Sequence, residues 1–123
     1  MRTEYYGSVK VTYFEKDKVW QAVGKLARDL EERFPEIRRA MVFGSLVHDR
    51  AVPGSDVDLL LVLKTSDRKF LDRPAKYRPD GFPVGLDIFA YTADEMEKML
   101  DDGNFFVRRA LREGKTLFER AQN

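Results

Sequence analysis

The sequence predicts a domain built from both helices and strands (α/β in the broad sense, and more narrowly α+β), in which helices pack on a small mixed β-sheet. The chain has 123 residues, the size of one domain. Helical and strand-like hydrophobic periodicities follow one another along it, and at least three strand-sized apolar segments can form a sheet. Neither an internal repeat nor a low-complexity linker interrupts the sequence, so we expect residues 1–123 to form a single domain.

The first third of the chain predicts a strand, a helix and a second strand. Alternating apolar residues at 9–13 indicate a short strand. A helix capped by Asp17 is predicted to run to about Arg33, because apolar residues recur at helical spacing on one face. Residues 37–43 form the next predicted strand.

A turn and a more strongly apolar strand follow. Ser45 can cap a short helix over 45–49, and a loop leads into a strand at 57–63. The unbroken apolar run of that strand indicates burial on both faces. Residues 65–82 predict only a short helix, at 68–71, before prolines interrupt the chain.

The last third begins with a strand and returns to helices. Thr92 and Glu95, three residues apart, form the signature of a capping box at a helix start. The predicted elements are a strand at 84–91, a helix from Thr92 to about residue 101, a helix at 105–113 and a strand at 116–118.

Composition narrows the classes of function. The absence of cysteine excludes disulfides, thiolate zinc sites and cysteine nucleophiles. The 22 basic and 21 acidic residues give a net charge of +1, so a long duplex nucleic acid is not expected as a partner. No apolar run approaches the roughly 20 residues that a membrane helix needs, and the first residues lack an apolar signal core. We therefore expect a cytoplasmic protein without a membrane partner.

Two aspartates stand at the start of the 57–63 strand. Asp56 and Asp58 point to the same face, because side chains alternate along a strand. Their backbones lie about 6–7 Å apart, a span that suits one or two divalent ions. No lysine or arginine within three residues can neutralise them. Ligands that are all oxygen favour magnesium or manganese over zinc.

A third carboxylate, Asp87, interrupts the apolar strand at 84–91. It lies on the face opposite Leu86 and Ile88, where a lone aspartate is costly unless it is paired or bound to a metal. If this strand lies beside the strand of Asp58, three carboxylates converge in a site that can hold two metal ions. The alternative is structural, since Asp-x-Asp pairs are common in loops and Asp87 alone can be a hydrogen-bonded strand-end residue.

A glycine–serine turn follows the 37–43 strand. The start of a helix presents free N–H groups and a partial positive charge, which suit a phosphate. Gly44 lets the backbone approach a ligand closely, and the Ser45 hydroxyl can donate to a phosphate oxygen. The alternative is an ordinary strand-to-helix turn in which Ser45 is only the N-cap.

The spacing of these motifs resembles a known family. Gly44-Ser45, ten further residues and Asp56-Val57-Asp58 resemble the signature of the DNA polymerase β-like nucleotidyltransferase superfamily. The stretch 42–60 is similar to its minimal branch, often called MNT, and Asp87 matches the third family carboxylate. The resemblance implies the polymerase β-like nucleotidyltransferase fold. It also implies a magnesium-dependent enzyme that moves a nucleoside monophosphate, first of all AMP from ATP, onto a protein or other hydroxyl acceptor.

The resemblance further implies a role for each matching residue. Gly44 and Ser45 would hold the triphosphate. Asp56 and Asp58 would ligate two magnesium ions, with manganese as an alternative, and Asp87 would ligate the catalytic ion and help to activate the acceptor hydroxyl. Many minimal members carry an arginine-rich turn after Gly-Ser. This chain has Leu46-Val47-His48-Asp49-Arg50 there, so Arg50 is the candidate nucleotide-binding residue of the turn, with His48 as the other basic choice.

The resemblance also bears on partners. Minimal members often act as antitoxins that pair with a helical HEPN ribonuclease toxin, which implies a HEPN-type partner protein. The altered turn favours one alternative, a catalytically weak or inactive module that binds nucleotide and masks a partner. A metal-dependent phosphohydrolase is a third reading. The complete set of three aspartates favours an enzyme over the module, and the Gly44-Ser45 turn favours transfer over hydrolysis.

Overall fold

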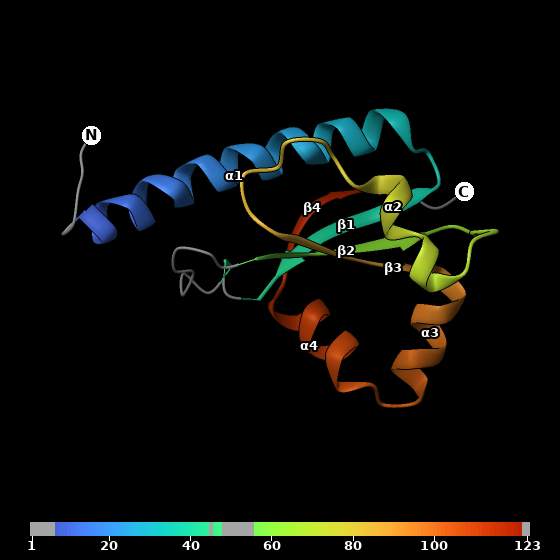
Figure 1. The fold of residues 1–123 in the computed structure, drawn as a ribbon. Helices are drawn as coiled ribbons and strands as arrows, with labels where there is room; N and C mark the ends of the chain where they lie inside the picture. Colours follow the sequence, from blue (N-terminus) through green and yellow to red (C-terminus); the bar gives the residue numbers. More distant parts are fainter. Residues whose placement is uncertain (1–6, 45, 48–55, 122–123) are drawn as a thin grey trace.

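A four-stranded sheet forms the centre of the molecule, with helices on both of its faces (Figure 1). The computed structural model describes residues 7–44, 46–47 and 56–121, with side chains from residue 16 onward. The strands lie in the order β3-β2-β1-β4; their bounds are Ile37–Phe43 (β1), Val57–Leu63 (β2), Leu86–Thr92 (β3) and Lys115–Glu119 (β4). Strand β1 is antiparallel to β2 and β4, whereas β2 and β3 are parallel. The predicted mixed sheet is therefore confirmed.

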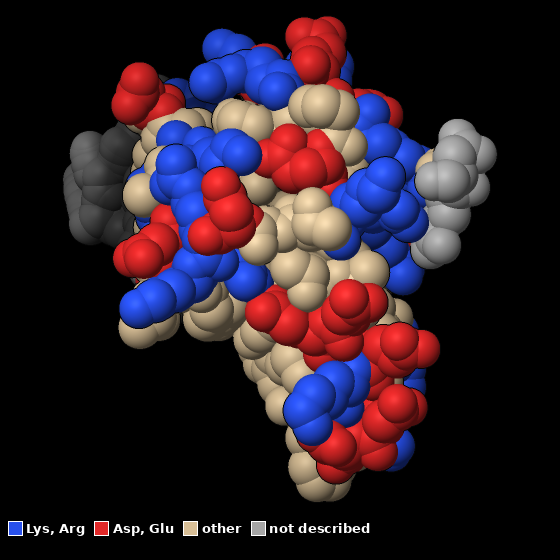
Figure 2. All heavy atoms as spheres, turned by 90° about the vertical axis from the view of Figure 1, so that its right-hand side faces the viewer, with Lys and Arg blue, Asp and Glu red and all other residues tan. Residues whose placement is uncertain are grey.

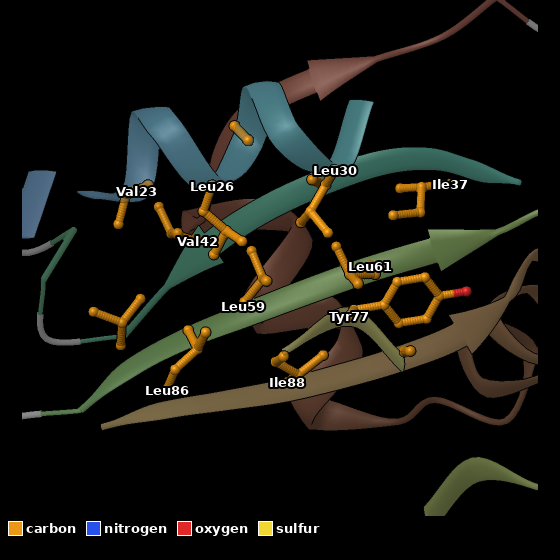
Figure 3. Close-up of a cluster of buried hydrophobic side chains, with 14 of the residues drawn as sticks. Val23, Leu26, Leu30, Ile37, Val42, Leu59, Leu61, Tyr77, Leu86 and Ile88 are labelled. Carbon is orange, nitrogen blue, oxygen red and sulfur yellow. The ribbon is translucent and has the colours of Figure 1, made fainter. Parts of the chain in front are cut away.

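Two apolar clusters hold the helices on the sheet. The larger lies beneath α1 (Gly7–Arg33) and α2 (Pro74–Tyr77) and includes Leu30 of α1 and Leu61 of β2 (Figure 3). The smaller lies on the opposite face, beneath α3 (Ala93–Asp101) and α4 (Phe105–Glu113), and includes Leu60 and Val107. Successive side chains of β2 thus enter opposite clusters, which confirms the predicted burial of this strand on both faces.

The first helix corrects the sequence analysis. The predicted strand at 9–13 is wrong, because these residues belong to α1, which runs for 27 residues and contains Asp17 rather than starting there. Alternation suggested a strand, but a helix anchored through buried Val23 and Leu30 extends at little cost per residue. Its end at Arg33 is as predicted. Among the described helices, α1 included, none combines the length and apolar character needed to cross a membrane.

The crossover between the parallel strands β2 and β3 also differs from the prediction. In place of a helix at 68–71 it contains a 3-10 helix, η1 (Phe70–Asp72), and the four-residue α2. Arg73, between them, is buried and donates to the carbonyl oxygen of Ala90 at 3.0 Å. Arg78 donates to the carbonyl oxygen of Leu86 at 2.6 Å. Both carbonyls point away from β2, so the two arginines cover the free edge of β3, where another strand would otherwise pair.

The helices of the second face begin and end as predicted. The Thr92–Glu95 capping box is formed in both directions, at 3.1 Å and 2.9 Å. Glu95 also forms a salt bridge with Arg73 at 2.6 Å, which ties the helix start to the crossover. The side chain of Asn104 caps α4 by accepting from the backbone N–H of Val107 at 3.0 Å.

Charged side chains are mixed over the surface that lies to the right in Figure 1. Basic and acidic residues lie interspersed over this side of the molecule (Figure 2). Such a distribution gives this side no continuous basic stripe of the kind that follows a nucleic-acid backbone.

Gly114, between α4 and β4, is packed too closely to accept a side chain. A Cβ atom there would lie 2.5 Å from the carbonyl oxygen of Ala110 and 3.0 Å from that of Val42. We expect Gly114→Ala to lower the free energy of unfolding by about 1–3 kcal/mol, because backbone atoms must move. Gly24→Ala is the control: its nearest neighbour would be 3.7 Å away, so alanine should stabilise α1 slightly. Urea unfolding measures both, and equal midpoints for the two variants would contradict this packing argument.

Candidate active site

The strand register brings Asp58 and Asp87 together at one end of the sheet. Asp58 of β2 is paired with Asp87 of the parallel strand β3, and on its other side with Phe43, the last residue of β1. Neighbouring strands lie about 4.8 Å apart. The condition stated for convergence of the carboxylates, that the strand of Asp87 lies beside the strand of Asp58, is therefore met.

Both aspartates point to the α3–α4 face of the sheet. Asp58 lies between Val57 and Leu59, and both of these side chains belong to the cluster under α1. Asp87 likewise lies between Leu86 and Ile88 of that cluster. Because strand side chains alternate, the two carboxylates share the opposite face. They occupy the end of that face that the helices leave accessible, since Asp58 is half-buried and Asp87 exposed.

Gly44 brings the turn after β1 directly against Asp58. Its φ of 86° is in the left-handed region, which disfavours a side chain. A Cβ atom at Gly44 would also lie 2.5 Å from Oδ2 of Asp58. The glycine predicted to approach a phosphate therefore leaves room for a carboxylate beside the same turn.

Gly85 leaves room for the carboxylate of Asp56, as Gly44 does for that of Asp58. The backbone N–H of Val57 donates to the carbonyl oxygen of Gly85 at 2.9 Å, which fixes the start of β2 beside the start of β3. A Cβ atom at Gly85 would lie 2.6 Å from Cγ of Asp56 and closer still to one carboxylate oxygen. The sequence analysis did not predict the contact of Gly85 with Asp56, because a residue pair so far apart in sequence gives no local signal.

The neighbouring carboxylates act electrostatically on Asp58. Burial raises the pKa of Asp58, and the negative charges of Asp87 and Asp56 raise it further. Within the described part of the chain, no ion pair or hydrogen bond links a basic side chain to any of the three aspartates. The site thus concentrates negative charge around Asp58 without a protein cation among these residues to offset it.

The carboxylates of the site suit magnesium as a partial set of ligands. Among residues 7–44, 46–47 and 56–121, no three acidic or histidine side chains are arranged to hold a metal ion by themselves. Magnesium, however, is usually held by one or two carboxylates together with water and substrate phosphates, rather than by a complete protein cage. The donors are all oxygen atoms, and two glycines leave room for the carboxylates of Asp58 and Asp56, which suits that kind of site.

Part of the predicted nucleotide site lies outside the described residues. Ser45, His48 and Arg50 belong to this part, as does most of the helix predicted at 45–49. Leu46, in contrast, is described, and it is buried in the cluster under α1. The apolar residue that follows Gly44-Ser45 therefore anchors the turn in the core, a role that the comparison with arginine-rich turns did not suggest.

Known proteins share this fold and sequence pattern. The nucleotidyltransferase domain family matches residues 23–113. No curated protein matches the chain. A crystal structure of a Sulfolobus solfataricus protein, described provisionally as a nucleotidyltransferase, superposes with a TM-score of 0.61. The match covers 98% of this chain and 93% of that one at 14% sequence identity, which establishes similarity of fold. The matched residues span both glycines and all three aspartates of the site, and the chain belongs to the nucleotidyltransferase domain family.

Proposed function

We propose that this nucleotidyltransferase is a magnesium-dependent enzyme that transfers AMP from ATP to a hydroxyl group of a protein or another acceptor. One observation carries the proposal: the register places Asp58 between the Gly44 turn and Asp87. A phosphate-binding turn and a carboxylate on the next strand thereby lie on either side of one central carboxylate. Such an arrangement suits phosphoryl transfer, which is catalysed mainly by positioning the reactants and by stabilising the charge of the transition state.

Each residue of the site has a part in the proposed reaction. Gly44 and Ser45 bind the triphosphate, with Arg50 as a further contact. Asp56 and Asp58 hold the divalent ions, and Asp87 completes the set. When bound, magnesium neutralises charge on the phosphates. The acceptor oxygen bonds to the α-phosphorus while the bond to the bridging oxygen breaks and pyrophosphate leaves. The Asp87 carboxylate takes the hydroxyl proton, since it is exposed and on the accessible face.

The proposed acceptor is a partner protein. The resemblance to the minimal branch supports a HEPN-type toxin in this role, so the chain would serve as the antitoxin of the pair. The absence of cysteine supports a cytoplasmic setting.

Transfer of label tests the proposal. Wild type is incubated with ATP labelled at the α-phosphate, magnesium and cell lysate, beside Asp58→Asn and a control, Asp67→Asn. Asp67 is exposed and lies in the turn beyond the opposite end of β2. We expect wild type and control to label a protein, and Asp58→Asn to lose at least about 100-fold of the label, as when a group that stabilises the transition state is removed.

The other outcomes identify the alternatives. Absence of label with wild type, together with partner capture that Asp58→Asn retains, would establish a binding module instead of an enzyme. Release of inorganic phosphate without a labelled acceptor would establish a phosphohydrolase.

A further inference from the structure

Three phenylalanine rings from separate elements meet on the face that carries the aspartates. The centroid of Phe106, in the first turn of α4, lies 5.3 Å from that of Phe43 and 5.0 Å from that of Phe89. Phe43 and Phe89 are themselves 5.8 Å apart. Phe43 and Phe89 pack against the cluster beneath α3 and α4, and Phe106 contacts both of their rings.

The strand register places this group beside Asp58. Phe43 is the partner of Asp58, whereas Phe89 is the partner of Leu60, the next residue of β2 on the same face. The ring of Phe106 contacts both phenylalanines, which flank β2 at Asp58 and Leu60. The three rings therefore form an apolar wall at the end of β2 that carries the central carboxylate.

The wall is anchored through the start of α4 and is not fully covered. Asn104 caps the helix start, and Val107, the residue after Phe106, is completely buried. Phe106 itself remains 36% exposed, and Phe43 and Phe89 are only partly buried. An aromatic ring kept partly open beside a polar site is typical of a surface on which a planar ligand packs.

We propose that Phe106, with the edge of Phe43, is the surface against which the base of the bound nucleotide packs. This inference rests on the proposed function, in which the Gly44 turn binds the triphosphate and Asp58 holds a divalent ion beside it. The nucleoside is attached to the α-phosphate of that triphosphate, and the aromatic wall begins at Phe43, which is both the neighbour of Gly44 and the register partner of Asp58. A phenyl ring cannot read hydrogen bonds, so the wall selects by stacking area. It favours purines over pyrimidines and does not separate adenine from guanine.

Nucleotide binding tests the inference without requiring transfer. Calorimetric titration with ATP, GTP and CTP in magnesium compares wild type, Phe106→Ala, Phe106→Leu and Phe106→Trp. Stacking of a base on an aromatic ring contributes about 1–3 kcal/mol, so we expect Phe106→Ala to weaken ATP and GTP binding by about 5- to 150-fold. Phe106→Leu keeps an apolar side chain for packing but should lose most of the preference for purines, whereas Phe106→Trp should retain it.

Phe105→Ala is the matched control. Phe105 is the preceding residue of the same helix, is 89% exposed and makes no ring contact among the described residues. Its replacement should leave the affinity for all three nucleotides unchanged. Thermal unfolding of each variant confirms that the fold persists, and Phe106→Leu decides the matter if Phe106→Ala unfolds.

The binding titration and steady-state kinetics together separate this inference from the proposed function. A purine preference in the titration that Phe106→Leu abolishes supports the base-packing surface, even where no acceptor becomes labelled. Label transfer with an unchanged KM for ATP in the Phe106 variants would overturn the surface and leave the enzyme standing. A rise in the KM for the acceptor alone, or an equal loss of ATP, CTP and inorganic triphosphate binding, would also overturn it.

Discussion

Gly85→Ala is expected to lower nucleotidyl transfer by about 100-fold or more while leaving the protein folded. The added Cβ atom cannot coexist with the observed carboxylate of Asp56, whose Cγ would lie 2.6 Å away. The φ of Gly85 is not in the left-handed region, so the backbone can accept alanine without strain. The Asp56 side chain must then rotate away. A displacement of about 1 Å in a catalytic group can reduce a rate by about 100-fold.

The dependence of the rate on magnesium distinguishes a displaced ligand from a general loss of structure. In Gly85→Ala the half-saturating magnesium concentration should rise, and a high concentration should restore part of the activity. Gly24→Ala introduces the same methyl group into α1, where its nearest contact would be at 3.7 Å, and should not change either quantity. Full activity of Gly85→Ala at every magnesium concentration would contradict the role of Gly85 in positioning Asp56.

The central strands could be predicted because their side chains carry a strong local pattern. Residues 57–63 are apolar throughout, and burial on both faces is what this pattern indicates. The predicted bounds of β1 and β2 are confirmed, as is the capping box at Thr92. In each case the physical determinant lies within a few residues of the position that it determines.

The incorrect predictions concern segments whose structure depends on distant partners. The alternation at 9–13 favours a strand locally, yet these residues continue a helix anchored by α1 residues further along the chain. The crossover around Arg73 is organised by contacts with Glu95 and the edge of β3, about 20 residues away in sequence. Intrinsic propensity is a weak guide where such tertiary contacts decide the conformation.

In the candidate site, too, features with a local sequence signal could be predicted, whereas features set by distant contacts could not. The sequence could identify Asp58 and Asp87 as candidates that meet if their strands are adjacent, and the parallel pairing of β2 and β3 supplies that adjacency. The contact of Gly85 with Asp56 and the position of Phe106 across β2 could not, since both follow from the packing of whole elements. These two features supply the most specific tests of the site.

Asp58→Asn is expected to stabilise the protein in the absence of magnesium, even though it removes the central ligand. Asp58 is half-buried, and its carboxylate is repelled by those of Asp87 and Asp56. No described basic side chain offsets this charge. An asparagine of nearly the same shape removes the repulsion and the cost of burying a charge. A gain of about 0.5–2 kcal/mol is typical when charge strain is relieved at a functional site.

Magnesium should reverse the order of stability. An ion that binds the folded wild type at about 100 times its dissociation constant adds about 2.7 kcal/mol, and Asp58→Asn should lose most of that increment. Calorimetric unfolding in a chelator and in magnesium measures both effects, with Asp67→Asn as the control that should behave like wild type in each. A lower melting temperature for Asp58→Asn in the chelator would contradict the repulsion. An equal response of wild type and Asp58→Asn to magnesium would show that the ion binds elsewhere. The wild-type chain is therefore expected to give up stability at Asp58 in order to keep an unneutralised carboxylate where a cation and a phosphate can meet it.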